Sequence, residues 1–533
     1  MNQNITFLKE FYLSNRHLMF RKPLKENYAQ AFSQKMHDGK MSQMARMTIG
    51  FTAMLHLEKA EIVPGEMLVG MRTIDSLIPM HTPGEYRRLH ETNYMIDGGY
   101  VQCALPDYAA LLEGGIGQLL KQAKERMQRG DCQQPEIELL TSIDMSLKGV
   151  QRWITKYATK AKIQQDMELF LTLSSLQKNC PYSLNEALQL LRIMQVMFFE
   201  AGYGMMPLGR IDQYLYRIYK TDTKQADFSE SDTLDRIEEF ILQSIKDAPS
   251  SDSPVGALMT LGGSSADGTS DFNELTYLFL RAAAELDLPY PAVVVRMGKH
   301  VGEEAKARVS EAMKQSKRSI LVSDEDVLIP KLLDSGYECE DAYNYALSLT
   351  GIPVVAGRSL VVPQLDWVSW VDLILDVLTE ELPACKDFEA LTARLTSACR
   401  RLGDRLETKY DKLYIFPAPL LTAFMDGGIE QCRDISKGTR YNEWFIHAVH
   451  GQAAEVILGL LKHTYYKEQK WTADEFIKSL DEKLRNGMEW PSEWGSREET
   501  SQLMHTLTDA LFGRFKDKKN NMGGRFHLLE HAE

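Results

Sequence analysis

The stretch from Asp341 to Ser359, DAYNYALSLTGIPVVAGRS, constrains the fold of this chain more than any other. A short helical segment, Asp341 to Ala346, which we call the lead-in, passes into a run of apolar, serine and threonine residues. Gly351 and Pro353 then interrupt this run. This order predicts a buried strand that ends in a sharp loop tip. Because α/β enzymes place reacting side chains on such tips, we expect Thr350, Gly351 and Ile352 to lie at a functional site. None of the three carries an acid, a base or a thiol.

Strand and helix patterns alternate ahead of this stretch. The segments PVGALMTLGG (254–263), PAVVVRM (291–297) and SILV (319–322) have the apolar character of buried strands. Between the first two, DFNE (271–274) is typical of a helix N-terminus. Residues 110–245 are strongly helical in pattern, so the sequence predicts an α/β fold with much helix outside.

Composition narrows the class of protein. The chain has 533 residues, 44% of them hydrophobic and 25% charged, which is ordinary for a globular protein with a large core. A net charge of −13 disfavours nucleic acid or an anionic membrane as a partner, since either would require a basic face. The seven cysteines form no CxxC pair, and no apolar run approaches the roughly 18 residues of a membrane span. We therefore expect a soluble cytoplasmic protein with reduced cysteines.

Eight pieces of the chain, taken in order, resemble the glycyl radical enzyme family, the pyruvate formate-lyase-like proteins with their dehydratase and decarboxylase relatives. The matching pieces are IVPGEMLVG (62–70), PDYAALLEGGI (106–116), NEALQLL (185–191), LGRIDQYLYRIY (208–219), LGGSSADGTSDFNELTYL (261–278), PAVVVRM (291–297), SDEDVLIPKLLDSGYECEDAYNYA (323–346) and APLLTAFMDGGIEQCRDISKG (418–438). The resemblance implies two half-barrels of strands surrounded by helices. On this basis we expect one barrel domain over 1–515, with a helical N-terminal portion and an incomplete C-terminal end, followed by a short polar tail, 516–533.

The resemblance also implies a mechanism, from which this sequence departs. In the family, a glycine radical in a motif resembling Arg-Val-Ser/Ala-Gly-Tyr takes a hydrogen atom from the cysteine of a Gly-Cys-Val-Glu loop. Alignment of the lead-in puts Thr350 at the cysteine and Ile352 at the glutamate. A hydroxyl holds its hydrogen too strongly for this transfer, and an isoleucine moves no proton. The printed sequence contains no Arg-Val-Ser/Ala-Gly-Tyr segment. We therefore expect no glycyl radical chemistry from this chain alone.

The resemblance places a set of candidate ligand-binding residues around the tip: Cys103, Arg210, Asp212, Thr350, Ile352, Arg358 and Asp366. Cys103 stands where some dehydratases place a substrate-contacting histidine, Arg358 is a candidate carboxylate clamp, and Asp366 matches a pocket acid only approximately. Each also has a structural interpretation. Cys103 would be a small half-buried side chain, and Arg210 with Asp212 would form a scaffold ion pair.

One feature has no counterpart in the family pattern, the segment FIHAVHGQAAE. His447 and His450, at positions i and i+3, would face the same side of a helix and form a candidate metal site. Glu455 lies off that face, and such pairs are common by chance. We predict no cofactor other than this candidate metal.

Three hypotheses about function remain open. The first is a divergent family member that binds a small polar or carboxylated metabolite, or a partner subunit. The second is a non-radical lyase or dehydratase that uses Cys103, Asp366 or a metal at His447 and His450. The third is one half of a split radical enzyme. A homodimer, or a complementing partner subunit, is expected to cover exposed sheet edges.

Overall fold

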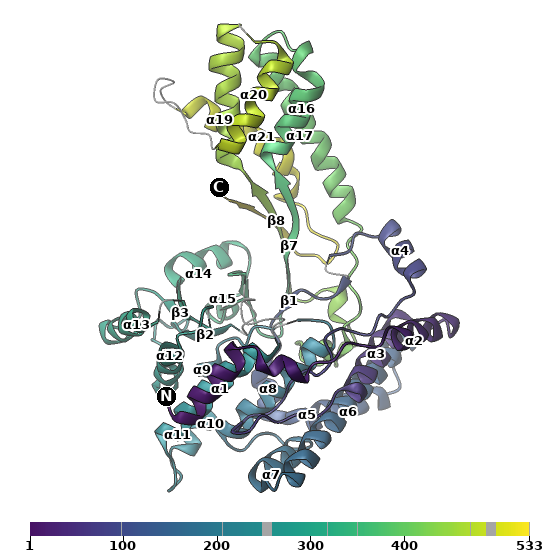
Figure 1. Cartoon of the computed structure of the whole chain (residues 1–533), viewed down its shortest axis with the longest axis vertical. Coiled ribbons are helices and arrows are strands. Elements are labelled where there is room, and N and C mark those ends of the chain that lie inside the picture. Colours follow the sequence, from purple (N-terminus) through teal and green to yellow (C-terminus); the bar gives the residue numbers. More distant parts are fainter. Residues whose placement is uncertain are drawn as a thin grey trace. The chain divides into compact units, whose positions relative to one another are not determined.

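The computed structural model of the chain describes residues 1–96, 99–204, 206–247, 258–290, 292–316, 318–348, 350–469, 471–486 and 497–531, with the backbone alone for 481–486. The chain divides into two compact units (Figure 1). Unit 1 comprises Met1–Leu89, Asp97–Leu360 and Ile415–Tyr441, and unit 2 comprises His90–Ile96, Val361–Tyr414 and Asn442–Glu533. The single domain expected over 1–515 therefore corresponds to parts of both units.

Helices make up most of unit 1. They are α1 (Gln3–Leu13), α2 (Glu26–Asp38), α3 (Gln43–Leu57), α5 (Tyr108–Gln128), α6 (Gln134–Ile163), α7 (Met167–Leu176), α8 (Leu184–Glu200), α9 (Ile211–Tyr214), α10 (Tyr216–Asp222), α11 (Glu230–Gln243), α12 (Glu274–Leu286), α13 (Glu303–Gln315), α14 (Glu325–Asp334), α15 (Cys339–Tyr343) and α18 (Pro419–Thr422), with α4 (Pro83–Thr92) at the boundary between the units. Several begin at a capping side chain, which the sequence predicts for the helix that starts after Asn273. Asp107, Ser183 and Asn273 accept the backbone N–H three residues on, which satisfies an otherwise free donor of the first turn.

A three-stranded parallel sheet lies within unit 1. Its strands are β2 (Met259–Gly262), β3 (Val293–Met297) and β4 (Ile320–Asp324), in the order β2-β3-β4. All described residues of β2 are buried, and Gly262 ends that strand with φ of 64°. Since the strands are parallel, their carboxyl ends meet at one edge. This edge presents Gly262, Arg296 and Ser323 in neighbouring register positions.

Two short strands after this sheet form the predicted loop tip. The strands β5 (Ala346–Leu347) and β6 (Pro353–Val354) pair antiparallel. Gly351 has φ of 76°, a left-handed conformation that glycine adopts without steric cost. The expectation of a buried strand that ends in a tight tip is confirmed. A further short strand, β1 (Cys103–Ala104), is buried.

Unit 2 joins a sheet to a group of helices. Its helices are α16 (Trp370–Glu381), α17 (Phe388–Tyr410), α19 (Gly451–Leu460), α20 (Ala473–Asn486) and α21 (Glu498–Phe512). The strand β8 (Tyr441–Val449) lies between β7 (Ser359–Ser369) and β9 (Arg525–Glu530), and β8 and β9 are parallel.

The strand β9 corrects the expectation of a polar tail over 516–533. Phe526 is 8% exposed, and its ring packs on those of Trp444, Phe515 and Tyr410. Lys518, within the lysine-rich stretch before β9, donates to both Glu407 and Asp411. The segment is polar in composition, yet it contributes a strand, one buried aromatic side chain and the ion pairs of Lys518.

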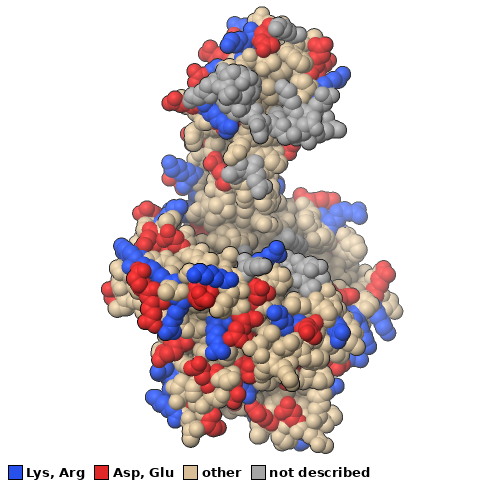
Figure 2. All heavy atoms as spheres, turned by 60° about the vertical axis from the view of Figure 1, so that its left-hand side comes forward, with Lys and Arg blue, Asp and Glu red and all other residues tan. Residues whose placement is uncertain are grey.

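The α/β fold class is confirmed. The described strands belong to separate sheets, none of which closes on itself as a barrel. Within the described ranges, every helix is too short or too polar to cross a bilayer. On the face in Figure 2, basic and acidic side chains intermingle, and the described residues there form no broad patch of one sign.

Candidate functional site

The hairpin tip is organised by Ser348. The Ser348 and Thr350 hydroxyls lie 2.9 Å apart in a hydrogen bond, and the backbone N–H of Ile352 donates to the Ser348 oxygen at 3.2 Å. The Ser348 N–H donates in turn to the Ile352 carbonyl at 2.9 Å. Thr350 is exposed, whereas the Ile352 side chain is buried. The tip therefore presents a hydroxyl to its surroundings and turns its isoleucine into the core.

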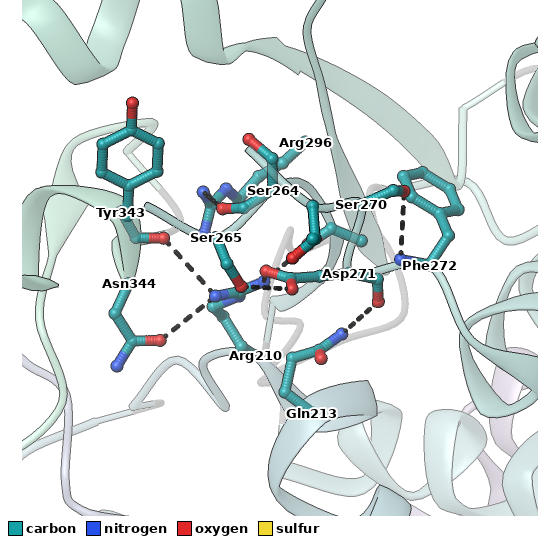
Figure 3. A network of polar contacts seen from close by, with 12 residues as sticks. Arg210, Gln213, Ser264, Ser265, Ser270, Asp271, Phe272, Arg296, Tyr343 and Asn344 are labelled. Atoms are coloured by element: carbon teal, nitrogen blue, oxygen red, sulfur yellow. Dashed lines mark hydrogen bonds and ion pairs between the residues drawn. The ribbon is translucent and has the colours of Figure 1, made fainter. Parts of the chain in front are cut away.

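Arg210 holds the lead-in of this hairpin (Figure 3). Its guanidinium donates to the Tyr343 carbonyl at 3.4 Å and to the Asn344 side-chain oxygen at 3.3 Å. It also pairs with Asp271 at 2.5 Å, and the Ser265 hydroxyl donates to the other oxygen of this carboxylate. Asp271 thus neutralises Arg210, and together they tie the turn after β2 to the lead-in.

Arg296 makes a second connection to the same lead-in. Its side chain is fully buried and donates to Glu325 Oε2 through Nε at 3.0 Å and through Nη2 at 2.5 Å. Nη1 donates to the Tyr345 carbonyl at 3.1 Å, and the guanidinium lies 4.2 Å from the centre of the Tyr345 ring. Gly263 allows this close packing, because a Cβ there would lie 2.7 Å from Glu325 and 2.8 Å from Arg296. A buried ion pair thus fixes the entry to the hairpin.

A cavity of about 380 Å³ lies beside the lead-in, within unit 1, and we call it the arginine cavity. Its charged lining residues are Asp107, Arg210, Glu340, Asp341, Arg358 and Asp426. Arg358 donates to Asp341 at 2.7 Å and to Asp426 at 3.2 Å. Tyr441, which stacks on Tyr337, donates its hydroxyl to the second oxygen of Asp341 at 2.6 Å. The lining carries four carboxylates and two guanidinium groups.

The arginine cavity brings together only two of the predicted site residues, Arg210 and Arg358. Asp212 is fully buried and accepts from the Gly262 N–H at 2.7 Å and from the Thr276 hydroxyl at 2.6 Å, and burial raises its pKa. It does not pair with Arg210, so the expected scaffold ion pair is wrong although the structural role is right.

Cys103 lies against the hairpin rather than in the arginine cavity. Its thiol is buried and hydrogen-bonded to the Ser348 side chain. Burial raises the pKa of Cys103 to about 12, against the smaller opposing effect of the Ser348 hydrogen bond. Cys103 is therefore a neutral thiol that reaches the Thr350 hydroxyl through one intervening side chain.

The remaining candidates belong to unit 2, and one expectation about them is wrong. Asp366, on β7, accepts from Lys409 at 2.5 Å and from the Tyr410 hydroxyl at 3.2 Å. His447 and His450 do not share a helix face, because His447 lies in β8 and His450 adopts a left-handed turn with φ of 60°. The aromatic and β-branched residues around His447 favour a strand.

Both ring nitrogens of His447 already have partners. Nδ1 is hydrogen-bonded to His531 Nε2 and Nε2 to the Pro363 carbonyl, each at 2.7 Å. Within the described ranges, no three histidine, cysteine or acidic side chains converge in a way that could hold a metal ion.

Sequence reasoning missed the acidic partners of the two arginines. Asp271, Asp341 and Asp426 all lie in segments that carry the family resemblance, but their pairing with Arg210 and Arg358 joins positions far apart in the chain. The same holds for the Arg296–Glu325 pair. The sequence did carry a signal for two of these aspartates. Asp271 follows the glycine-rich segment 262–268, and Asp426 directly precedes Gly427 and Gly428. Aspartates beside glycine turns commonly hydrogen-bond the nearby backbone.

Comparison with known proteins identifies the family. The family model described as Pyruvate formate lyase-like matches residues 92–528. Isethionate sulfite-lyase of Bilophila wadsworthia is 31% identical over 150 residues, which cover 26% of this chain and 18% of that protein. (2S)-3-Sulfopropanediol dehydratase of Klebsiella oxytoca is 20% identical over 440 residues, or 74% of this chain and 53% of that protein. The chain thus spans about half, or less, of the length of these curated relatives.

Solved structures agree on the fold. The glycerol-bound B12-independent glycerol dehydratase from Clostridium butyricum has a TM-score of 0.81 at 17% identity, covering 99% of this chain and 80% of that one. A glycyl radical enzyme from Archaeoglobus fulgidus has a TM-score of 0.76 at 16% identity, covering 99% and 81%. The chain has the fold of a glycyl radical enzyme, and it belongs to the pyruvate formate lyase-like family.

Proposed function

We propose that this chain binds a small, uncharged, hydroxylated metabolite in the arginine cavity and performs no glycyl radical chemistry by itself. The hairpin tip supports the proposal that the chain performs no glycyl radical chemistry by itself. Thr350 stands where the family resemblance places the thiyl cysteine, and its hydroxyl is hydrogen-bonded to Ser348. An alcohol O–H is a poor hydrogen-atom donor, and the buried Ile352 supplies no acid or base at the neighbouring position.

The charge balance of the cavity supports the choice of ligand. Each guanidinium already has a carboxylate partner, Asp271 for Arg210 and both Asp341 and Asp426 for Arg358. A carboxylated ligand would compete with these partners inside a lining that carries an excess of negative charge. A hydroxyl group both donates to carboxylates and accepts from guanidinium groups, so a compact polyol matches this lining without displacing either.

The names of relatives support the same class. Glycerol dehydratase, 1,2-propanediol dehydration and sulfopropanediol dehydratase all refer to small molecules that carry hydroxyl groups. Sulfopropanediol and isethionate also carry a sulfonate group, which is anionic at neutral pH. The arginine cavity of this chain favours the uncharged members of that set.

A thermal-shift titration tests the proposal. Purified protein is heated with increasing glycerol, 1,2-propanediol, lactate or isethionate, at constant ionic strength. A ligand at a hundred times its Kd stabilises the protein by about 2.7 kcal/mol. We expect saturable stabilisation by a diol or triol that Arg358→Gln abolishes and that Arg308→Gln, a change at an exposed helix pair, leaves intact. Saturable stabilisation by the anions alone would refute the ligand class.

A second candidate function rests on Cys103. Its protonated thiol contacts Ser348, the residue that holds Thr350, and it is therefore placed to stand in for the missing cysteine. In this proposal a complementing partner subunit carries the glycine radical, and the two chains together act as a lyase or dehydratase. The test is anaerobic co-expression with a candidate partner, with the glycyl radical followed by electron paramagnetic resonance. Turnover that survives Cys103→Ala would exclude this role, and a homodimer without a radical would favour the binding function.

A further inference from the structure

Two cysteines far apart in the sequence meet on the surface of unit 1. Cys132 lies between α5 and α6, and Cys432 lies in the turn after α18, where its φ of 51° is left-handed. Both side chains are half-buried, and the Cys132 side chain is close enough to Cys432 to contribute to the raised pKa of that thiol. Neither belongs to the arginine cavity or to the hairpin tip.

Arg126 fastens the two segments to each other. Its Nη1 lies 3.1 Å from the Cys132 sulfur, and its Nε donates to the Glu430 carbonyl at 2.8 Å. Arg129 adds a two-point pair with the Glu430 carboxylate. The Cys432 thiol donates to the Ile429 carbonyl at 3.5 Å, within the same turn. The loop that carries Cys132 and the turn that carries Cys432 are therefore held together before any bond forms between the sulfurs.

The two thiols differ in their surroundings. The Cys132 sulfur accepts a hydrogen bond from Arg126 Nη1 at 3.1 Å, and the same guanidinium also pairs with the Asp131 carboxylate. Burial raises the pKa of Cys432 to about 11, against the smaller opposing effect of the Arg126 guanidinium. At neutral pH Cys432 therefore keeps its proton. The pair combines one thiol in contact with a guanidinium and one protonated thiol near it.

We infer that Cys132 and Cys432 form an oxidisable dithiol, a site at which a hydroperoxide produces an intramolecular disulfide. The Cys132 thiolate attacks the peroxide O–O bond, giving Cys132 sulfenic acid and releasing hydroxide or alkoxide. The Cys432 sulfur then attacks the sulfenic sulfur, and the hydroxyl leaves with the Cys432 proton as water. Overall, two thiols and one hydroperoxide yield one disulfide, one water and one alcohol or second water.

The disulfide would act on the wall of the arginine cavity. The turn that carries Cys432 follows residues 423–430, which line a neighbouring cavity of about 530 Å³ together with α5. Asp426, the partner of Arg358, lies in the same segment and lines both cavities. Oxidation would tie this segment to the loop after α5, so that the dithiol and the ligand cavity share one structural element.

Peptide mapping tests the inference. The full chain, carrying Cys180→Ser and Cys339→Ser to remove its two exposed thiols, is treated anaerobically with one equivalent of hydrogen peroxide, alkylated and digested. We expect a peptide that joins Cys132 to Cys432 and that dithiothreitol separates. In Cys432→Ser, Cys132 should accumulate as a sulfenic acid that dimedone traps. Alkylation of both thiols after oxidation, or a disulfide from Cys132 to any other cysteine, would overturn the inference.

The role of Arg126 has its own matched control. Arg126→Lys and Arg126→Met should slow dimedone labelling of Cys132 at least several-fold at neutral pH. Arg129→Met removes the neighbouring pair with Glu430 without touching the sulfur, and should leave the rate near that of the parent. Circular dichroism establishes that each variant is folded. Equal rates in the parent and in both Arg126 variants would show that the thiol is not activated by this contact.

Discussion

Breaking the Arg296–Glu325 pair is expected to destabilise unit 1 and to release the lead-in of the hairpin. Arg296→Met removes every donor to Glu325 from this side chain and the bond to the Tyr345 carbonyl. The Glu325 carboxylate, 2% exposed, would keep only the Ser264 N–H and hydroxyl as donors. Loss of one partner from a buried pair typically costs about 3–5 kcal/mol, because the remaining charge stays buried without its counterion.

Glu325→Gln should cost a similar amount, since it leaves a fully buried guanidinium opposite a neutral amide. The double variant carries no buried charge at this position. We therefore expect its cost to fall short of the sum of the two single costs by at least about 2 kcal/mol, within the range observed for residues in direct contact. The exposed Arg308–Glu304 pair serves as a control, and Arg308→Met should cost less than about 1 kcal/mol.

Urea unfolding followed by far-UV circular dichroism measures these free energies, and hydrogen exchange localises them. Trp153 is the only tryptophan of unit 1, so tryptophan fluorescence reports chiefly on unit 2 and should change little. Peptides that cover 343–348 should exchange faster in each single variant. Additive costs in the double variant, or unchanged exchange of these peptides, would refute the assignment of this pair as the anchor of the hairpin.

Three further changes test other parts of the structure. Burial lowers the pKa of His17 to about 4, so below about pH 6.5 the unfolded chain takes up a proton that the native chain refuses until about pH 4. Stability should fall by up to about 3 kcal/mol across that window, and His17→Phe should remove this part of the loss in urea titrations at pH 7.5 and 4.5. Gly428→Ala would place a Cβ 2.1 Å from the Thr422 carbonyl oxygen, so this change should lower the melting temperature. A melting temperature equal to that of the parent would contradict the contact. Phe526→Ala should cost roughly 3–5 kcal/mol and expose β9 to hydrogen exchange, whereas protection like the parent's would argue against its packing role.

Local signals explain what the sequence predicts well. The cap at Asn273 needs only an amide oxygen and the next three residues, so the helix after it begins where the sequence predicts. The strands β2 and β3 carry apolar runs and are buried as expected, whereas β4 forms as a strand but leaves Leu321 and Val322 exposed. The hairpin tip carries glycine at its left-handed position. Each of these features is decided by residues within one or two turns of chain.

Non-local pairing explains what the sequence reasoning missed. The His447–His450 spacing fits one face of a helix, yet the segment pairs as a strand with β9, whose residues lie about eighty positions later. The lysine-rich stretch before β9 is likewise fixed by a distant partner, because Lys518 donates to Glu407. Periodicity within a short window cannot register a partner strand that has yet to appear in the chain.

The arginines show why residue type alone gave too simple an expectation for the site. Arg358 suited a carboxylate clamp in isolation, but the fold supplies Asp341 to it, just as it supplies Asp271 to Arg210. Arg210 and the buried Arg296 both donate to backbone carbonyls of the lead-in, at Tyr343 and Tyr345. These cations therefore act first on the position of the hairpin. Two ion pairs, Arg210–Asp271 and Arg296–Glu325, therefore hold the segment that leads into Thr350, and this anchoring is a property of the fold that holds whatever group stands at the tip.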